Sequence, residues 1–266
     1  MRRTHITALA PRSGTTLLFE MMAASFGWDG LARHEMHLGE RPDREVDRLL
    51  TKSPGDLFIL GRALRDDPVL QAVIVLRDPR DVIVSRHRRM PGHYWTNMVS
   101  FRRNLAAYEA LRTHPRVVVV RYERLVLEPD DVQRDIEGAL DGLVRRTAFS
   151  NYVETARPTP DAERALGSVR PVSTSRVGAW RDHLPRMMAQ ERKFGPIGPL
   201  LDRLGYRDPD WPACLSGVAG DNGRCRRERL PFGPLLSYHR RVLVTSAYGL
   251  CRMGFPPRAP ILDGTG

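Results

Sequence analysis

The loop at residues 11–16, with the sequence P-R-S-G-T-T, joins a short apolar run at residues 6–10 to an apolar helical pattern at residues 17–26. This order is typical of a strand, a tight loop and the N-terminus of a helix. Free N–H groups at a helix N-terminus bind anions, and hydroxyls with an arginine strengthen such a site for phosphate. A Walker A loop carries a lysine directly after its second glycine. Here Thr15 follows the glycine, and the basic residue, Arg12, lies two positions before it. The predicted phosphate ligands are Arg12, Ser13, Gly14, Thr15 and Thr16; an ordinary strand-to-helix turn with Ser and Thr caps is the alternative.

A second motif covers residues 73–85, with the sequence V-I-V-L-R-D-P-R-D-V-I-V-S. Its first four residues form a continuous apolar run, as in a buried parallel strand. Arg77 stands at the end of that run, and Asp78-Pro79 is typical of a helix start, with Asp as N-cap and Pro at the first position. We expect Ser85 about two turns into that helix. Ligands of open α/β sheets bind beyond the carboxyl ends of the strands, so we expect Arg77 near the first loop; an Asp–Arg pair that closes a turn is the alternative.

Together the two motifs resemble those of the PAPS-dependent sulfotransferases (PAPS is 3′-phosphoadenosine 5′-phosphosulfate). The first loop looks like that family's loop for the 5′-phosphosulfate. The second motif looks like its 3′-phosphate segment, with Arg77 and Ser85 at the family's spacing of eight residues. Residues 117–123 resemble a strand that ends in an aromatic-acidic pair. Residues 175–180 resemble the late segment that closes over the nucleotide, although they lack its common Arg-Lys-Gly. The resemblance covers roughly residues 4–185 and implies further cofactor contacts from Tyr122, Arg176 and Gly178.

Lys52 is one of only two lysines, because 40 of the 42 basic residues are arginines. Such a bias indicates a GC-rich, bacterial genome, and Lys52 is either a chance survivor or a retained functional group. It follows a short apolar stretch and matches the lysine that sulfotransferases place after their second strand. A compact ammonium differs from the planar guanidinium of arginine. It can stay in contact with the oxygen that bridges phosphate and sulfur in PAPS while negative charge develops on that oxygen. We therefore predict that Lys52 is catalytic, together with Arg12.

The general base is predicted from residues 33–40, R-H-E-M-H-L-G-E. In the tyrosylprotein sulfotransferases a Glu in this connection serves as base, and Glu35 lies 23 residues after Arg12, close to that placement. Another branch of the family uses a His two residues after the lysine, where this chain has Pro54. Glu35 is therefore the predicted base, His34 and His37 are the alternatives, and a polar surface loop is the non-functional interpretation. His-x-Glu spacing alone lacks the third ligand of a metal site, and the family needs no metal, so none is expected.

Apolar strands that alternate with helices predict an α/β fold: a three-layer α/β/α structure with a central parallel sheet, like the P-loop NTPases. We predict a sulfotransferase domain at residues 1–210 and a Pro/Gly/Arg-rich extension at 211–266. Within the extension we expect a linker at 217–229 and a terminal helix at 232–253. The predicted strands are 4–10, 49–52, 71–77 and 116–121, and the predicted helices are 15–26, 56–66, 79–89, 97–113 and 130–140.

A net charge of +11 and a pI of about 10.4 are compatible with a nucleic-acid partner. The arginines are dispersed, however, and a co-substrate with two phosphates and a sulfate itself requires a basic pocket, so we expect no nucleic-acid partner.

Three cysteines without C-x-x-C spacing indicate neither a disulfide framework nor a zinc site. The first predicted strand begins by Thr4, which leaves no room for a signal peptide, and no apolar run is long enough to insert into a membrane. We therefore expect a cytoplasmic protein.

The predicted reaction moves a sulfuryl group from PAPS to a hydroxyl or amine of a small molecule, glycan or lipid, and releases PAP. A P-loop kinase that uses ATP is the alternative; it would lack the Walker lysine and would need Asp78 for Mg²⁺. A non-catalytic nucleotide-sensing or nucleic-acid-binding domain is a third interpretation. The sequence does not identify the acceptor or the oligomeric state. The acceptor pocket is expected along residues 27–48, 86–98 and 141–175, where Met90, Tyr94, Trp95 and Phe149 form either an apolar wall or part of the core.

Overall fold

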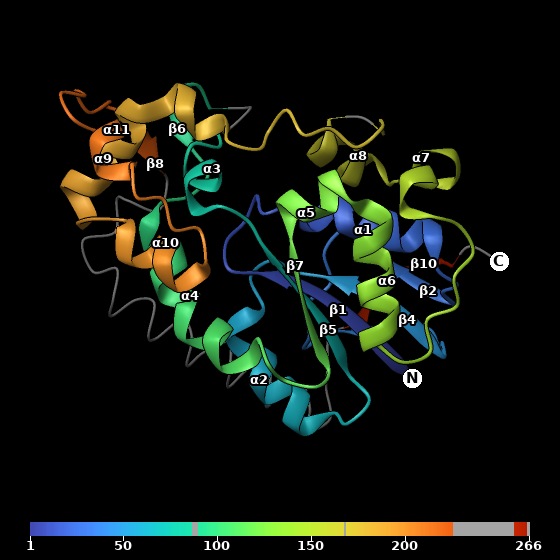
Figure 1. Ribbon diagram of the computed structural model, residues 1–266. Helices are drawn as coiled ribbons and strands as arrows, with labels where there is room; N and C mark the ends of the chain where they lie inside the picture. The colour runs from blue at the N-terminus through green and yellow to red at the C-terminus, as the bar shows by residue number, and fades with distance from the viewer. Residues whose placement is uncertain (87–89, 168, 226–257, 265–266) are drawn as a thin grey trace.

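The computed structural model describes residues 1–86, 90–167, 169–225 and 258–264. Within this part of the chain a six-stranded sheet has the strand order β10-β2-β4-β1-β5-β7 (Figure 1). Neighbouring strands are parallel except at the edge, where β10 runs antiparallel to β2. The predicted α/β fold is confirmed, with the correction that the sheet is mixed. Its strands are β1 (Arg2–Ala8), β2 (Gly30–Ala32), β4 (Arg48–Lys52), β5 (Gln71–Leu76), β7 (Val117–Arg121) and β10 (Ile261–Asp263).

Strand β5 shows how the sheet forms its two cores. Its side chains alternate between the faces, as the two-residue period of a strand requires. Ala72, Ile74 and Leu76 pack into one apolar cluster with α2 (Leu57–Asp66), α4 (Met98–Leu111) and α10 (Gly198–Leu204). Val73 and Val75 pack into the other with α1 (Thr15–Ser25), α5 (Tyr122–Leu127) and α6 (Pro129–Ala139). Helices therefore cover both faces of the sheet (Figure 1).

Shorter elements complete the described chain. The helices are α3 (Pro79–Ile83), α7 (Tyr152–Thr155), α8 (Pro160–Leu166), α9 (Leu184–Phe194) and α11 (Trp211–Cys214), with 3₁₀ turns at Phe149–Asn151 and Ala179–His183. Two small parallel pairs join β3 (Arg41–Pro42) to β9 (Arg258–Ala259) and β6 (His93–Tyr94) to β8 (Arg224–Cys225). No helix in these described ranges has both the length and the apolar character needed to cross a membrane.

The helix predicted at residues 79–89 is much shorter than expected. It begins as predicted, because the Asp78 side chain accepts from the backbone N–H of Arg80 and Pro79 takes the first position. It ends at Ile83, however, and the backbone carbonyl of Ser85 accepts from the N–H of Trp95 at 3.0 Å. The chain therefore leaves the helix to meet β6, and Ser85 lies beyond the helix instead of two turns inside it.

Tertiary pairing also creates elements that the local pattern did not predict. The connection expected at residues 27–48 contains β2, and the strand expected at 116–121 is followed directly by α5. The described parts of the predicted extension pack against the rest of the chain: Trp211 stacks edge-on against Trp180 at 5.2 Å between ring centroids, and β10 joins the main sheet. The division at residue 210 stays a prediction for residues 226–257, and the predicted helix at 232–253 lies outside the described residues.

Candidate active site

The loop after β1 is held in a conformation that suits anion binding. Arg12 has a φ of 75°, and Gly14, the N-cap of α1, has a φ of 98°. A Cβ on Gly14 would lie 2.5 Å from the Tyr122 ring, so only glycine fits under that ring. The hydroxyl of Ser13 donates to the carbonyl of Ala10 at 2.9 Å, which closes the loop. The first N–H groups of a helix have no partner within the helix, so the start of α1 presents donors at this loop, as the sequence predicts.

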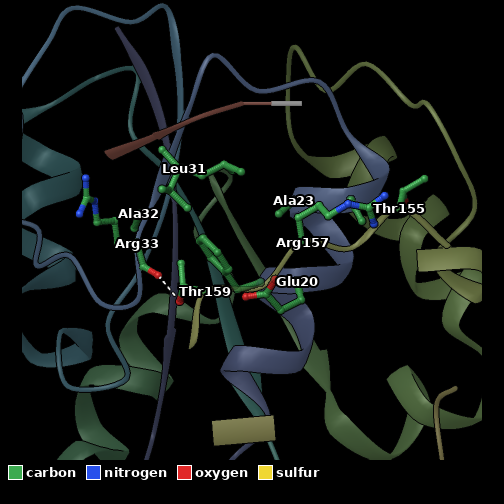
Figure 2. A pocket seen from close by; sticks show the side chains of 11 residues that line it. Glu20, Ala23, Leu31, Ala32, Arg33, Thr155, Arg157 and Thr159 are labelled. Carbon is green, nitrogen blue, oxygen red and sulfur yellow. Dashed lines mark hydrogen bonds between the residues drawn. The ribbon is translucent and has the colours of Figure 1, made fainter. Parts of the chain in front are cut away.

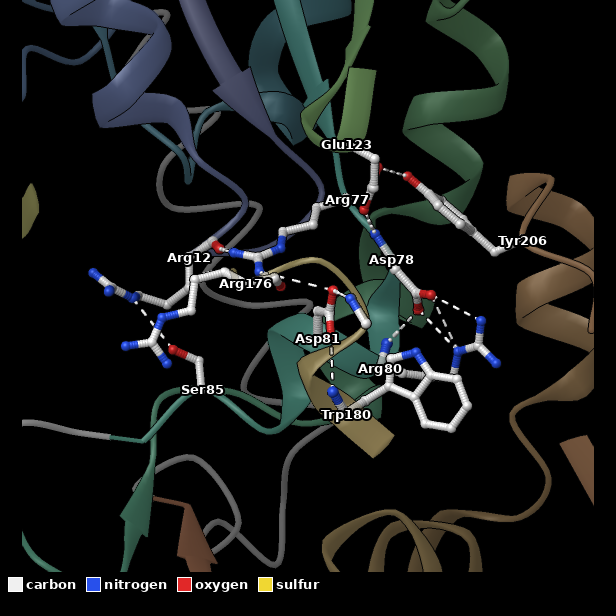
Figure 3. A network of polar contacts seen from close by, with 11 residues as sticks. Arg12, Arg77, Asp78, Arg80, Asp81, Ser85, Glu123, Arg176, Trp180 and Tyr206 are labelled. Atoms are coloured by element: carbon white, nitrogen blue, oxygen red, sulfur yellow. Dashed lines mark hydrogen bonds and ion pairs between the residues drawn. The ribbon is translucent and has the colours of Figure 1, made fainter. Parts of the chain in front are cut away.

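Arg77, at the end of β5, is fixed by contacts to both predicted nucleotide segments (Figure 3). One guanidinium nitrogen donates to the carbonyl of Arg12 at 3.3 Å and the other to the carbonyl of Arg176 at 2.6 Å. The guanidinium also lies 4.1 Å from the centroid of the Tyr122 ring and 3.8 Å from the Asp81 carboxylate. The Nε of Arg77 is buried without a hydrogen-bond partner among the described residues. Arg77 thus joins the loop after β1 to the late segment at residues 175–180, and its Nε–H donor is not used by a described residue.

Asp81 organises the late segment. Its carboxylate accepts from the backbone N–H groups of Gly178 at 2.9 Å and Trp180 at 3.0 Å (Figure 3). Gly178 has a φ of 74°, which favours glycine at this turn. Burial raises the pKa of Asp81, although Arg77 and these two N–H groups oppose the shift. Sequence reasoning gave Asp81 no role, although it lies within the second motif.

Arg80 and Glu123 stabilise the motif at residues 73–85 through ion pairs and a hydrogen bond. The Arg80 guanidinium pairs with the carboxylates of Asp78 and Asp208 and lies 4.1 Å from the centroid of the Trp180 ring. Glu123 accepts from the backbone N–H of Asp78 at 2.8 Å. The carboxylate of Asp78 is therefore occupied by its cap and its ion pair, which fits the predicted helix start better than a metal ligand.

Ser85 and Arg12 bring the two predicted phosphate sites together. The Nε of Arg12 donates to the Ser85 hydroxyl at 3.4 Å (Figure 3). The Arg12 guanidinium also lies 5.7 Å from the centroid of the Trp95 ring. Seventy-three residues separate Arg12 from Ser85 in the sequence. The fold therefore places the predicted 5′-phosphosulfate and 3′-phosphate ligands in one continuous basic site.

Lys52 lies on the other side of the loop, at the end of β4. It is 1% exposed, and its Nζ donates to the Thr16 hydroxyl at 3.1 Å. The ammonium also lies 5.9 Å from the centroid of the Phe19 ring. Burial lowers the pKa of Lys52, whereas the carboxylates of Glu35 and Glu20 oppose the shift. The structure thus brings Lys52 to the first turn of α1, next to the predicted phosphate loop.

The connection that carries the predicted base runs beside Lys52. The backbone N–H of Met36 donates to the carbonyl of Lys52 at 3.0 Å, which places the neighbouring Glu35 within the electrostatic reach of the lysine. Glu35 is exposed. His34 is partly buried; burial first and Lys52 second lower its pKa, and its Nδ1 has no partner among the described residues.

His37 is directed away from the lysine. Its Nδ1 lies 2.8 Å from the Asp56 carboxylate and 3.0 Å from the Ser53 hydroxyl. The same carboxylate accepts from the backbone N–H of Leu38 at 2.8 Å. The hydrogen bond to Asp56 raises the pKa of His37. These contacts fasten the connection to the start of α2, so His37 supports the position of Glu35.

A cleft opens between α1, β2 and the segment from α7 to α8 (Figure 2). Glu20 projects from α1 into it, opposite Thr159, whose hydroxyl donates to the carbonyl of Arg33 at 2.7 Å. Sequence reasoning missed Glu20; its only signal is an acidic residue inside the otherwise apolar pattern at 17–26. The cleft is lined by residues from two of the regions expected for the acceptor, 27–48 and 141–175, and by α1, which was not expected.

The predicted apolar wall is divided: Tyr94 and Phe149 belong to the core, whereas Met90, 36% exposed, and Trp95 lie at the surface. Phe149 is fully buried and packs edge-on against Phe26 at 5.8 Å between ring centroids, so it does not line the cleft. Tyr94 is buried, and its hydroxyl donates to the Asp221 carboxylate at 2.6 Å. Trp95, in contrast, is 38% exposed beside Arg12.

No group of three or more His, Cys, Asp or Glu side chains in the described ranges has a geometry that could hold a metal ion. Cys214 is a free thiol, Cys225 is buried, and Cys251 lies outside the described residues.

Comparisons with known proteins return similar folds and no related sequence. No protein-family model matches the chain, and no curated protein matches it. Among solved structures, the sulfotransferase domain of the Synechococcus PCC 7002 olefin synthase is 18% identical, with a TM-score of 0.46, over 68% of this chain and 87% of that one. Mouse sulfotransferase SULT7A1, complexed with PAP, is 14% identical with a TM-score of 0.47, over 80% and 87% of the two chains. The sulfotransferase domain of the curacin biosynthetic pathway is 16% identical with a TM-score of 0.39, over 69% and 98%. Each of these TM-scores is below 0.5, so the likenesses carry no argument about the family or activity of this chain.

Proposed function

We propose that this protein is a sulfotransferase that moves a sulfuryl group from PAPS to a hydroxyl or amine of an acceptor and releases PAP. The observation that carries the proposal is the junction of the two phosphate-site motifs: Arg77 bonds the carbonyls of Arg12 and Arg176, and Arg12 reaches Ser85. Hydrogen bonds thereby join segments from three distant parts of the sequence, and we infer that they form one anion site.

The site offers a distinct set of groups to each end of the nucleotide. The N–H groups at the start of α1, with Arg12 and the hydroxyls of the loop, suit the 5′-phosphosulfate. Arg77 and Ser85 suit the 3′-phosphate, because a guanidinium matches phosphate geometry with two parallel donors. Tyr122 supports the loop beneath Gly14. Arg176 and Gly178, in the late segment, are proposed to contact the nucleotide as well.

Lys52 and Glu35 are proposed for the transfer step. The bond between sulfur and the bridging phosphate oxygen breaks while a bond from sulfur to the acceptor oxygen or nitrogen forms. Lys52 donates to the bridging oxygen as negative charge collects there, and Arg12 stabilises the moving group. The acceptor proton passes to Glu35, a step that typically contributes ~10²–10⁴-fold. The acceptor approaches through the cleft beside Glu20; a small molecule, glycan or lipid acceptor and a cytoplasmic location stay predictions.

Two features favour sulfuryl transfer over phosphoryl transfer from ATP. The loop has Thr15 where a Walker loop has its lysine, and the basic group that reaches α1 comes from β4 as Lys52. The carboxylate of Asp78, which a kinase would need for Mg²⁺, is paired with Arg80.

Calorimetric titration with PAP, without Mg²⁺ and with ATP as comparison, tests the proposal. We expect micromolar or tighter binding of PAP, weaker binding of ATP, and loss of PAP affinity in Arg77→Ala. Arg102→Ala is the matched control, because Arg102 also binds backbone carbonyls but at the end of α9. Tight, Mg²⁺-dependent binding of ATP without preference for PAP would refute the sulfotransferase proposal and support a P-loop kinase instead.

A further inference from the structure

Glu20 is a buried carboxyl on the wall of a cleft. It is 4% exposed on α1, between Phe19 and the alanines at 23 and 24, and it forms one wall of the cleft (Figure 2). No hydrogen bond or ion pair of its carboxyl is found with the described residues. Burial of a carboxylate without a partner is costly, so a nearby positive charge is needed to offset it.

Lys52 supplies that charge from one turn away. Residues four apart on a helix lie on the same face, so Glu20 sits directly below Thr16. The Thr16 hydroxyl accepts from the Nζ of Lys52 at 3.1 Å. The ammonium and the carboxyl therefore share one face of α1, and both are almost fully enclosed.

The arrangement differs from a salt bridge in a useful way. No carboxylate of the described residues lies within 4.0 Å of the Lys52 ammonium. A direct ion pair would aim the N–H donors of Lys52 at the carboxylate. A carboxylate one turn below stabilises the charge and leaves the remaining donors directed to the loop.

We propose that Glu20 is a positioning residue that acts through Lys52: it provides the buried negative charge that holds Lys52 as an ammonium while leaving its donors free for the bridging oxygen. The role in sulfuryl transfer rests on the proposed function. The charge pair itself does not, because it is a property of the protein without any nucleotide.

The titration of both groups supports this pairing. Burial raises the pKa of Glu20 to about 7, although Lys52 opposes the shift. Above that pH the carboxylate is ionised and raises the pKa of Lys52; below it the counter-charge is lost. Glu35 is the larger of the two carboxylate effects that raise the pKa of Lys52, but it is exposed to water, which screens its charge, whereas Glu20 is buried.

Other groups face the pair from neighbouring elements. They are His34 on the connection, Tyr152 on α7, whose hydroxyl donates to the carbonyl of Arg170, and the exposed Arg33 and Arg157 at the cleft. The hydrogen bond to Asp56 raises the pKa of His37, so the titration of this histidine must be separated from that of Glu20.

The composition of the chain makes the experiment direct. With only two lysines, protein labelled with ¹³Cε-lysine gives two NMR signals, which Lys193→Arg assigns. We expect the Lys52 signal to shift twice as pH rises, with a small step near 7 from Glu20 and a main step at its own pKa. In Glu20→Gln the small step should vanish and the main midpoint should fall by about one pH unit.

Glu35→Gln is the matched control and should retain the step near 7, since it leaves Glu20 unchanged. The proposal is overturned if the step persists in Glu20→Gln, which would assign it to a histidine, or if the Lys52 midpoint does not move. Should Glu20→Gln not fold, unsubstituted protein labelled at the glutamate carboxyl carbons decides. One carboxyl must then titrate with the same midpoint as the Lys52 step, and unequal midpoints overturn the pairing.

A PAP titration of the same samples separates the two proposals. An intact charge pair in a protein that does not bind PAP would refute the sulfotransferase and keep the pair. PAP binding without any coupling between Glu20 and Lys52 would support the sulfotransferase and refute the charge pair.

Discussion

The Arg77 side of the site and the Lys52 side are built in opposite ways. The Arg77 guanidinium is held by two backbone carbonyls, a carboxylate and an aromatic ring. Within the described part of the chain, the Lys52 ammonium has one hydrogen bond, to the Thr16 hydroxyl, and lies near the Phe19 ring. One cation is anchored in place, whereas the other is enclosed but keeps donors available.

The difference matches what each cation is proposed to do. Arginine stays charged in any protein environment, so heavy anchoring makes it a fixed phosphate ligand. The pKa of a buried lysine responds to its surroundings, so the charge of Lys52 depends on nearby carboxylates. A rigidly held Arg77 is suited to binding the 3′-phosphate. A lysine with available N–H donors is suited to the bridging oxygen, because the charge on that oxygen increases during the reaction. Removing each feature in turn tests this comparison.

Lys52→Ala should have the largest effect and should separate transfer from binding. We expect the transfer rate to fall about 10²–10³-fold, as when one donor to a developing charge is removed, while PAP affinity stays nearly unchanged. The rate of PAP formation from PAPS measures the first and calorimetry the second. Lys193→Ala, at the only other lysine, is the control and should match the unsubstituted protein. If PAP affinity in Lys52→Ala fell as much as the transfer rate, the proposed difference between a binding Arg77 side and a catalytic Lys52 side would be wrong.

Arg77→Ala should act on binding, and selectively on the 3′-phosphate. A hydrogen bond to a charged group contributes about 1.5–3 kcal/mol, so PAP affinity should fall roughly 10–150-fold. ADP, which lacks the 3′-phosphate, should bind both proteins equally. Equal losses for PAP and ADP would show that Arg77 supports the loop through the Arg12 carbonyl and does not itself bind the phosphate.

Gly14→Ala should weaken the loop that both sides share. The φ of 98° is unfavourable for alanine, and the new Cβ would lie 2.5 Å from the Tyr122 ring. We expect the free energy of unfolding to fall by about 1–3 kcal/mol, measured by denaturant unfolding, with weaker PAP binding. Gly138→Ala is the opposite control, because Gly138 lies in α6 with nothing within 4 Å of its Cβ position. That change should stabilise the protein by about 0.5–1 kcal/mol. Unchanged stability in Gly14→Ala would contradict the packing of Tyr122 on the loop.

His37→Gln should have the smallest effect and a defined pH dependence. Asp56 raises the folded-state pKa of His37 above 6.5, so the pair stabilises the protein fully below pH 6.5 and loses this contribution as pH rises through the folded-state pKa. The His37 side chain is 58% exposed, so the contribution should stay below about 1 kcal/mol. The difference in Tm between the two proteins should be larger at pH 6 than at pH 9. A difference that grows with pH would contradict the pairing with Asp56.

The sequence alone determined the parallel strands, the phosphate loop and the helix start at Asp78, because these depend on residues that are neighbours in the chain. A buried strand and a capped helix end both have local signatures, and the ends of parallel strands converge by geometry, which placed Lys52, Arg12 and Arg77 at one edge. Local patterns also explain the errors. Nothing between residues 79 and 89 signals that Ser85 must leave the helix to accept from Trp95.

Only the tertiary structure decided which distant groups meet. Arg77 reaches the Arg176 carbonyl across 99 residues, β10 closes the sheet edge antiparallel to β2, and Phe149 turns into the core. In the sequence, Glu20 is the single charged residue of a largely apolar helix. It becomes a candidate partner of Lys52 because β4 packs against α1 and encloses both side chains. Electrostatic interactions in a protein depend on distance through space and on exclusion of water, and neither is written in the order of the residues.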